Sequence, residues 1–187
     1  MIKILTNQKD IKIMKAIQML MVVAAIFSFS GILSAGEMLD IKGSFGAELK
    51  DGAPEDWYPN KPGWDAAGTL AMNKIPDTGK YALQVTSQTK AMYLYGKQWP
   101  VGSGEKCVIK GMVKGKGKGS LGMYTYPGGG YLRKEFSATE DWTEFTAEII
   151  IPEKNPKIEK ISFVISVSSG SSIEFLDVTA EIVKKQE

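Results

Sequence analysis

Residues 161–167 have the sequence ISFVISV, in which an apolar residue occupies every second position from Ile161. Side chains of a β-strand point alternately to two faces, so a period of two predicts a strand with one apolar face. The same alternation recurs at residues 81–86, 107–114 and 144–151, between segments rich in Gly, Pro, Asn and Asp. Several half-buried strands at this spacing predict an all-β fold, a two-sheet antiparallel β-sandwich.

The most unusual turn signal is the run KGKGKG at residues 114–119. Alternating glycines favour a turn and the lysines favour solvent, so we expect this run to form an exposed hairpin tip. A phosphate-binding loop is the alternative interpretation. The run lacks the spacing of a P-loop and has no helix after it, which argues against that alternative.

The first 35 residues resemble a secretory signal peptide in their layout. Four lysines precede an apolar run at residues 19–33, and Ser34, Ala35 and Gly36 then offer a cleavage site. An uncleaved membrane anchor is the alternative, but the run is shorter than the ~20 apolar residues that span a bilayer. We therefore expect a helical signal peptide at residues 1–35, no membrane contact after cleavage, and a secreted or periplasmic protein with one domain at residues 36–187.

Charge and composition exclude several classes of function. Residues 1–35 hold four of the 23 basic residues and one of the 21 acidic ones, so 19 basic and 20 acidic residues remain. A nearly neutral domain is a poor partner for nucleic acid. Histidine is absent, which excludes Ser-His and Cys-His catalysis and the usual zinc sites. Cys107 is the only cysteine, and the alternation of its segment predicts a buried thiol without a disulfide partner.

A family resemblance extends over nearly all of the expected domain. The segments that carry it are, in chain order, residues 42–45 (KGSF), Asp56 with Trp57, residues 79–83 (GKYAL), residues 104–109 (GEKCVI), residues 141–145 (DWTEF) and residues 175–178 (FLDV). They resemble the jelly-roll carbohydrate-binding modules of families 4, 9 and 22, which share a galactose-binding-like sandwich. The resemblance implies a jelly roll that binds a polysaccharide or oligosaccharide without catalysis, with a co-secreted glycosidase as a possible companion.

The resemblance also implies a structural calcium ion. In such modules the closing aspartate is one ligand, which corresponds to Asp177 here, and the backbone near Lys80 supplies others. Oxygen ligands of this kind suit calcium. The sequence departs from the family at Gly46, where a glutamate is usual. Asp177 as an ordinary residue at a strand end is the alternative interpretation.

Two Met-Tyr-X-Tyr stretches supply the candidate ligand-binding residues. In residues 121–126, Leu121 and Met123 take the core face of a strand, which places Tyr124 and Tyr126 on the outer face. Tyr93 and Tyr95 share their parity with Trp99 and also with Lys97, so they are either buried or exposed by a register break near Gly96. Aromatic rings on an outer sheet face are suited to stacking against sugar rings.

Four further residues complete the expected ligand-binding set. Tyr131 follows a glycine-rich loop and lies next to Arg133, the only arginine, whose guanidinium suits sugar hydroxyls or a uronate carboxylate. Trp64, in a long loop, is either a rim residue of the site or a residue that pins the loop, and Gln84 is a polar residue with outward parity. An ordinary hairpin end is the alternative for Tyr131 and Arg133.

The remaining tryptophans are expected to be structural. Trp57 and Trp142 occupy positions that form core in the modules that the chain resembles, and Trp99 alternates with Val101 as an inward residue does. These observations favour a secreted, non-catalytic carbohydrate-binding domain over two alternatives. One is an envelope or extracellular sandwich used for structure or protein contacts. The other is a glycosidase with paired carboxylates, for which the sequence lacks a compact acidic motif.

Overall fold

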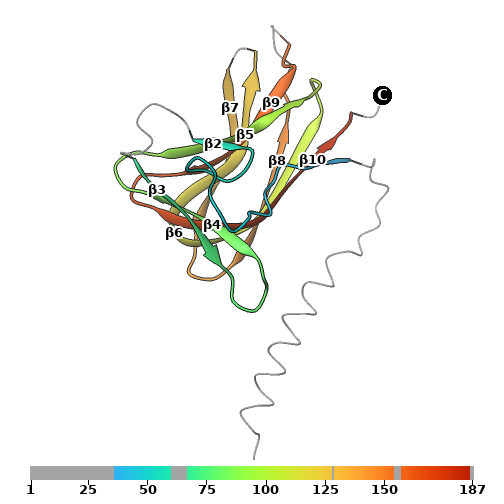
Figure 1. Cartoon of the computed structure of the whole chain (residues 1–187). Helices are drawn as coiled ribbons and strands as arrows, with labels where there is room; N and C mark the ends of the chain where they lie inside the picture. Colours follow the sequence, from blue (N-terminus) through green and yellow to red (C-terminus); the bar gives the residue numbers. More distant parts are fainter. Residues whose placement is uncertain (1–35, 60–66, 128, 154–156, 186–187) are drawn as a thin grey trace, which may run out of the picture. The chain divides into compact units, whose positions relative to one another are not determined.

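A computed structural model of the chain describes residues 36–59, 67–127, 129–153 and 157–185 (Figure 1). Ten strands make up this part of the chain: β1 (Glu37–Leu39), β2 (Trp57–Pro59), β3 (Gly68–Lys74), β4 (Tyr81–Ser87), β5 (Met92–Pro100), β6 (Lys106–Tyr126), β7 (Gly130–Ala138), β8 (Thr143–Ile150), β9 (Lys160–Val167) and β10 (Ser172–Val183). The alternating segments at 81–86, 107–114, 144–151 and 161–167 all lie in or overlap these strands, as predicted.

All strand pairs are antiparallel and form two sheets that share β6. Sheet I has the order β3-β4-β10-β6-β8, with β1 added to the other end of β10. Sheet II has the order β2-β5-β9-β6-β7. The expected all-β antiparallel sandwich is therefore confirmed. The predicted signal peptide lies outside the described residues, and no membrane-spanning helix occurs within them.

The strand β6 passes from one sheet to the other within the KGKGKG run. Residues up to Lys116 pair with β10 in sheet I, and residues from Gly117 onward pair with β7 in sheet II. Gly115 and Gly117 have φ values of 137° and 105°, which favour glycine. A Cβ atom at Gly115 would lie 2.2 Å from the carbonyl oxygen of Ser172. The expected hairpin tip is wrong: the glycines allow one long strand to bend and pack closely at the sandwich corner.

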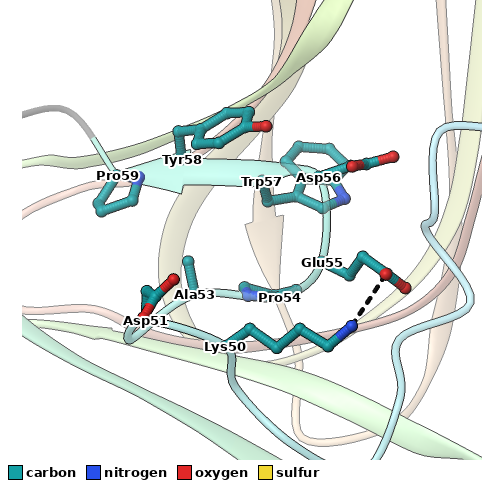
Figure 2. A pocket seen from close by; sticks show the side chains of 9 residues that line it. All are labelled: Lys50, Asp51, Ala53, Pro54, Glu55, Asp56, Trp57, Tyr58 and Pro59. Carbon is teal, nitrogen blue, oxygen red and sulfur yellow. Dashed lines mark hydrogen bonds and ion pairs between the residues drawn. The ribbon is translucent and has the colours of Figure 1, made fainter.

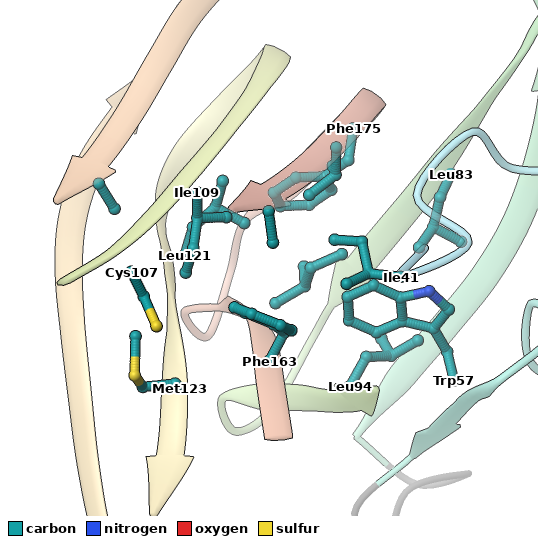
Figure 3. Close-up of a cluster of buried hydrophobic side chains, with 14 of the residues drawn as sticks. Ile41, Trp57, Leu83, Leu94, Cys107, Ile109, Leu121, Met123, Phe163 and Phe175 are labelled. Carbon is teal, nitrogen blue, oxygen red and sulfur yellow. The ribbon is translucent and has the colours of Figure 1, made fainter. Parts of the chain in front are cut away.

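The core lies between the inner faces of the two sheets (Figure 3). Leu121 and Met123 are buried, as their parity predicted, and Trp57 is 2% exposed. Trp99 is half-buried and packs against the same cluster, so both tryptophans are structural as expected. Trp142 is not: it is half-buried outside the core cluster, with the Lys114 ammonium 5.6 Å from its ring. Its neighbour Thr143 pairs with the inward Val113, which turns Trp142 to the outer face of sheet I.

Cys107 is fully buried between β8 and β10, opposite Ile149 and Ile182. This placement confirms the predicted buried thiol. Burial raises the pKa of Cys107 to about 12, because a thiolate would have no solvation there. The thiol is therefore neutral and inert at ordinary pH.

Candidate functional site

Five tyrosines lie on the outer face of sheet II, and they come from three strands. Tyr93 and Tyr95 belong to β5, Tyr124 and Tyr126 to β6, and Tyr131 to β7. Their neighbours Met92, Leu94, Leu121 and Met123 are buried on the inner face. The register of β5 shifts between Tyr95 and Gln98, which is the break that Lys97 suggested. The open question about Tyr93 and Tyr95 is thereby resolved, because both share a face with Tyr124.

A sixth tyrosine extends this row and was not identified from the sequence. Tyr58 pairs directly with Tyr95 across β2 and β5, so the two side chains point to the same side of the sheet. Tyr58 is 58% exposed, whereas the preceding residue, Trp57, is buried. The sequence did contain a signal for Tyr58: it directly follows the core residue Trp57, and successive side chains of a strand face opposite sides. We call the six residues the tyrosine face: Tyr58, Tyr93, Tyr95, Tyr124, Tyr126 and Tyr131.

Ring contacts join five residues of the tyrosine face in two groups, Tyr93 with Tyr131 and Tyr95 with Tyr124 and Tyr126. The ring centroids of Tyr95 and Tyr124 are 6.0 Å apart, and those of Tyr93 and Tyr131 are 5.9 Å apart, both pairs at an interplanar angle of 76°. Tyr124 and Tyr126 are closer, at 5.0 Å. Such pairs stabilise one another by about 1 kcal/mol. The rings are thus held in fixed orientations by their neighbours, and burial among them raises the pKa of Tyr95.

A chain of hydroxyl groups lies beneath one end of the face. The Tyr131 hydroxyl is 2.8 Å from the Ser120 hydroxyl, which is 2.7 Å from that of Ser166. Burial raises the pKa of Tyr131, while hydrogen bonding with Ser120 and Ser166 opposes that rise. Three hydroxyls carry three protons, and two links use two of them. One proton of the chain therefore remains to donate to another acceptor.

Arg133 lies beside this chain on β7. Its guanidinium is 5.1 Å from the centroid of the Tyr131 ring. Its Nε donates a hydrogen bond to Glu135 Oε1 at 2.9 Å, and its Nη2 lies 2.9 Å from the same oxygen in an ion pair. Gly122 pairs with Arg133, and a Cβ atom there would lie 2.3 Å from the carbonyl oxygen of Leu132. The glycine at position 122 thus permits close pairing of β6 with β7.

A small depression opens at this end of the tyrosine face. Its volume is about 90 Å³, and Tyr93, Ser120 and Ser166 form part of its wall. The charged residues around it are Lys118, Arg133 and Glu135. Aromatic, hydroxyl and charged groups therefore converge here within one concave site.

Gln84 does not join the tyrosine face, although its outward parity was correct. It lies on β4 of sheet I, where it donates to the Ser172 hydroxyl and accepts from Asn73, both at 3.2 Å. Parity within one strand does not tell which sheet the strand joins, so an outward residue of sheet I looks the same in the sequence as one of sheet II. Trp64 lies outside the described residues.

A second depression, of about 470 Å³, lies beside β2 and is lined by residues 50, 51 and 53–59 (Figure 2). Two of its three acidic residues form ion pairs with lysines: Glu55 is 2.9 Å from the Lys50 ammonium, and Asp56 is 3.4 Å from that of Lys97. The hydrogen bond from Lys50 lowers the pKa of Glu55. A glycosidase acid requires the opposite shift.

The calcium ion that the resemblance implies would bind at Asp177. The Asp177 carboxylate forms an ion pair with the Lys80 ammonium, so a cation already lies at the expected ligand. Among the residues that the structure describes, no three acidic or other metal-ligating side chains gather at one point. The calcium ion stays a prediction of the resemblance.

Comparison with known proteins identifies the fold. No protein-family model matches the sequence, and no curated protein matches it. The CBM22-1 xylan-binding domain of Paenibacillus barcinonensis Xyn10C superposes with a TM-score of 0.53 at 15% identity, over 82% of this chain and 99% of that domain. A CBM4 structure superposes with a TM-score of 0.50 at 16% identity, over 75% and 97% of the two chains.

Other proteins with different activities share the architecture. A cyclase from Fischerella sp. TAU superposes with a TM-score of 0.62 at 10% identity, over 82% of this chain and all of the cyclase. This chain spans only 20% of a tailspike protein domain from bacteriophage CBA120 and 27% of an arabinose-bound GH51 α-L-arabinofuranosidase that also superpose on it. At these identities the likeness concerns the fold. The chain has the jelly-roll β-sandwich fold found in carbohydrate-binding modules such as CBM4 and CBM22.

Proposed function

We propose that this protein is a secreted, non-catalytic carbohydrate-binding domain that stacks sugar rings on the tyrosine face. The observation that carries the proposal is the tyrosine face itself, in which six rings from four strands occupy one side of sheet II. Tyrosine offers a flat apolar surface for a pyranose ring and a hydroxyl for its polar edge.

The neighbouring side chains support the same ligand class. Ser162 and Ser166 of β9 lie between the tyrosines of β5 and those of β6, at outward positions of the register. Both serines are buried, but Ser166 also borders the depression beside Tyr93, where its hydroxyl can donate to or accept from a sugar hydroxyl. One of the domains with this fold is named as xylan-binding, which is consistent with a polysaccharide partner.

The acidic residues support a binding role without catalysis. Glu135 is the only acidic residue that the paired strands of sheet II place on the outer face, and it forms an ion pair with Arg133. Glycoside hydrolysis ordinarily requires two carboxyl groups that face each other across the bond. A companion glycosidase, exported separately, would supply that chemistry.

Affinity gel electrophoresis against a panel of neutral and acidic polysaccharides tests the proposal. We expect at least one polysaccharide to retard the protein, and the double variant Tyr124→Ala, Tyr126→Ala to lose about tenfold or more in affinity, because each stacked ring contributes about 1 kcal/mol. Tyr58→Ala is expected to lose several-fold without a change in melting temperature, since Tyr58 is exposed.

Trp142→Ala is the matched control, because Trp142 is a half-buried aromatic residue on the outer face of the other sheet. It should bind as the wild-type protein does. Binding that survives in the double tyrosine variant would contradict the proposed site. A protein that no polysaccharide retards, but that associates with itself or with an envelope protein, would instead have the structural or protein-contact role.

A further inference from the structure

We infer that the depression beside Tyr93 is a subsite for a carboxylate-bearing sugar, a uronic acid residue within the bound polysaccharide. This inference rests on the proposed function and specifies the class of its ligand. It begins from the charges of the outer face of sheet II. The paired strands place Lys118, Arg133 and Lys160 on this face and only Glu135 as an acid, which gives the tyrosine face a positive field.

The lysines of the face are available to a ligand. Both Lys118 and Lys160 are exposed, and neither forms an ion pair with any residue that the structure describes. Lys160 pairs with Tyr126 across β9 and β6, whereas Lys118 borders the depression at the opposite end of the face. An acidic chain that runs along the tyrosines therefore meets a cation at each end.

The guanidinium of Arg133 is oriented before a ligand arrives. The Tyr131 ring lies 5.1 Å from it, and Glu135 engages Nε and Nη2 through a single oxygen. Only Nε forms a hydrogen bond with the Glu135 carboxylate, so the Nη groups remain to donate to a carboxylate in the depression. A fixed planar donor of this kind is well matched to a carboxylate.

The hydroxyl chain supplies a further donor to the same place. Tyr131, Ser120 and Ser166 share two hydrogen bonds, so one proton remains unused within the chain. Ser120 and Ser166 both border the depression. If Tyr131 donates to Ser120, and Ser120 to Ser166, the Ser166 hydroxyl donates into the depression. Hydrogen bonds to ionised acceptors are stronger than those to neutral ones, which favours a carboxylate over a sugar hydroxyl at this point.

The test uses one polysaccharide in two charge states. Glucuronoxylan is compared by isothermal titration calorimetry with the same polymer after chemical reduction of its carboxyl groups to alcohols. We expect the acidic form to bind about five- to tenfold more tightly at 20 mM salt. We expect this advantage to shrink at 500 mM salt, because salt screens exposed charges. Polygalacturonate serves as a second acidic polymer and dextran sulfate as a sulfated one.

Three variants assign the effect to the site. Arg133→Gln should abolish the advantage of the acidic form and leave the reduced form bound as before. Glu135→Gln should increase the advantage, since it removes the one acidic side chain that the paired strands of sheet II place on the outer face. Lys74→Gln, on β3 of sheet I, removes the same charge as a change at Arg133 without touching sheet II and should behave as wild type.

The outcomes separate this inference from the proposed function. If acidic and reduced polymers bind equally, the uronate subsite is refuted and the carbohydrate-binding function stands. If dextran sulfate binds as tightly as the uronates and Arg133→Gln weakens all of them alike, the recognition is of charge in general and the inference is also refuted. If neither form of any polymer in the panel binds, both proposals fail.

Discussion

Cys107 is enclosed by apolar residues of β8 and β10, and its pKa of about 12 stands against an ordinary value of 9.0. In the unfolded chain the thiol ionises as the pH rises above about 9, whereas in the folded protein it stays protonated. The folded state then holds more protons than the unfolded state, so this group contributes stability that is lost as the pH rises toward 12.

We predict that the free energy of unfolding of the wild-type protein falls more steeply between pH 9 and pH 11 than that of Cys107→Ala. The difference between the two slopes should be about 1.4 kcal/mol per pH unit. Urea unfolding of both proteins at pH 8, 9, 10 and 11 measures this difference. Lysines and tyrosines titrate in the same range, but they are common to the two proteins and cancel. Parallel pH profiles would contradict the assigned pKa.

Alternation along one strand was enough to place single tyrosines correctly. Leu121 and Met123 fixed the inner face of their strand, so the outward direction of Tyr124 and Tyr126 followed from the sequence. Tyr93 and Tyr95 could not be placed, because Trp99 and Lys97 share their parity in the sequence and only the register shift before Gln98 separates them. The expectation that Gln84 joins the tyrosines was wrong for a different reason. The sheet to which a strand belongs is set by its long-range partners, and the sequence of one strand does not encode them.

At the scale of the strand, β6 is the element that determines the architecture. Its residues pair with β10 and β8 in sheet I and with β7 and β9 in sheet II. The KGKGKG run gave the correct local signal, glycine at positions of positive φ. Its interpretation as a hairpin tip was wrong because a turn and a bent strand require the same residues, and only the long-range partners distinguish them.

We predict that Gly115→Ala destabilises the fold by about 2 kcal/mol or more. The substitution forces a non-glycine residue to φ 137° and brings its Cβ within 2.2 Å of the Ser172 carbonyl oxygen. Thermal or urea unfolding monitored by circular dichroism measures the change.

Gly46→Ala is the matched control for this substitution. A Cβ atom at Gly46 would have no neighbour within 4 Å, and the backbone there has no strained φ. The free energy of unfolding of this variant should therefore lie within about 1 kcal/mol of the wild-type value. Equal effects of the two substitutions would show that the bend of β6 does not depend on Gly115.

At the scale of the whole molecule, the resemblance identified from dispersed motifs corresponds to the fold that the structure and its neighbours show. Core positions such as Trp57 and Phe175 carry most of that correspondence, because packing between two sheets constrains them strongly. Trp142 was assigned to the core by the same resemblance and lies outside it. A calcium ligand at Asp177 was also inferred by resemblance, and the Asp177 carboxylate forms an ion pair with Lys80.

The calcium ion therefore remains a prediction of the resemblance, and the geometry around Asp177 predicts the opposite outcome. We expect the melting temperature of the protein to change by less than about 1 °C between 5 mM calcium chloride and 5 mM EDTA, because ligand binding would raise it in proportion to saturation. Differential scanning fluorimetry measures both conditions. A rise of several degrees with calcium, reversed by EDTA, would establish a cation site and overturn our interpretation of the Lys80–Asp177 pair.

The six tyrosines are not equally supported by the fold. Tyr93, Tyr95 and Tyr124 stand on β5 and β6, each of which pairs with a strand on either side, and Tyr131 stands on the nine-residue β7, which pairs with β6; each of these four rings contacts another ring of the face. Tyr58 stands on β2, a three-residue strand that pairs with β5 alone. Substitutions at the centre of the tyrosine face thus affect both folding and ligand binding, whereas substitutions at Tyr58 affect ligand binding almost alone. Over evolutionary time the preference for one glycan or another is freest to change at this edge, where adaptation does not compete with the integrity of the domain.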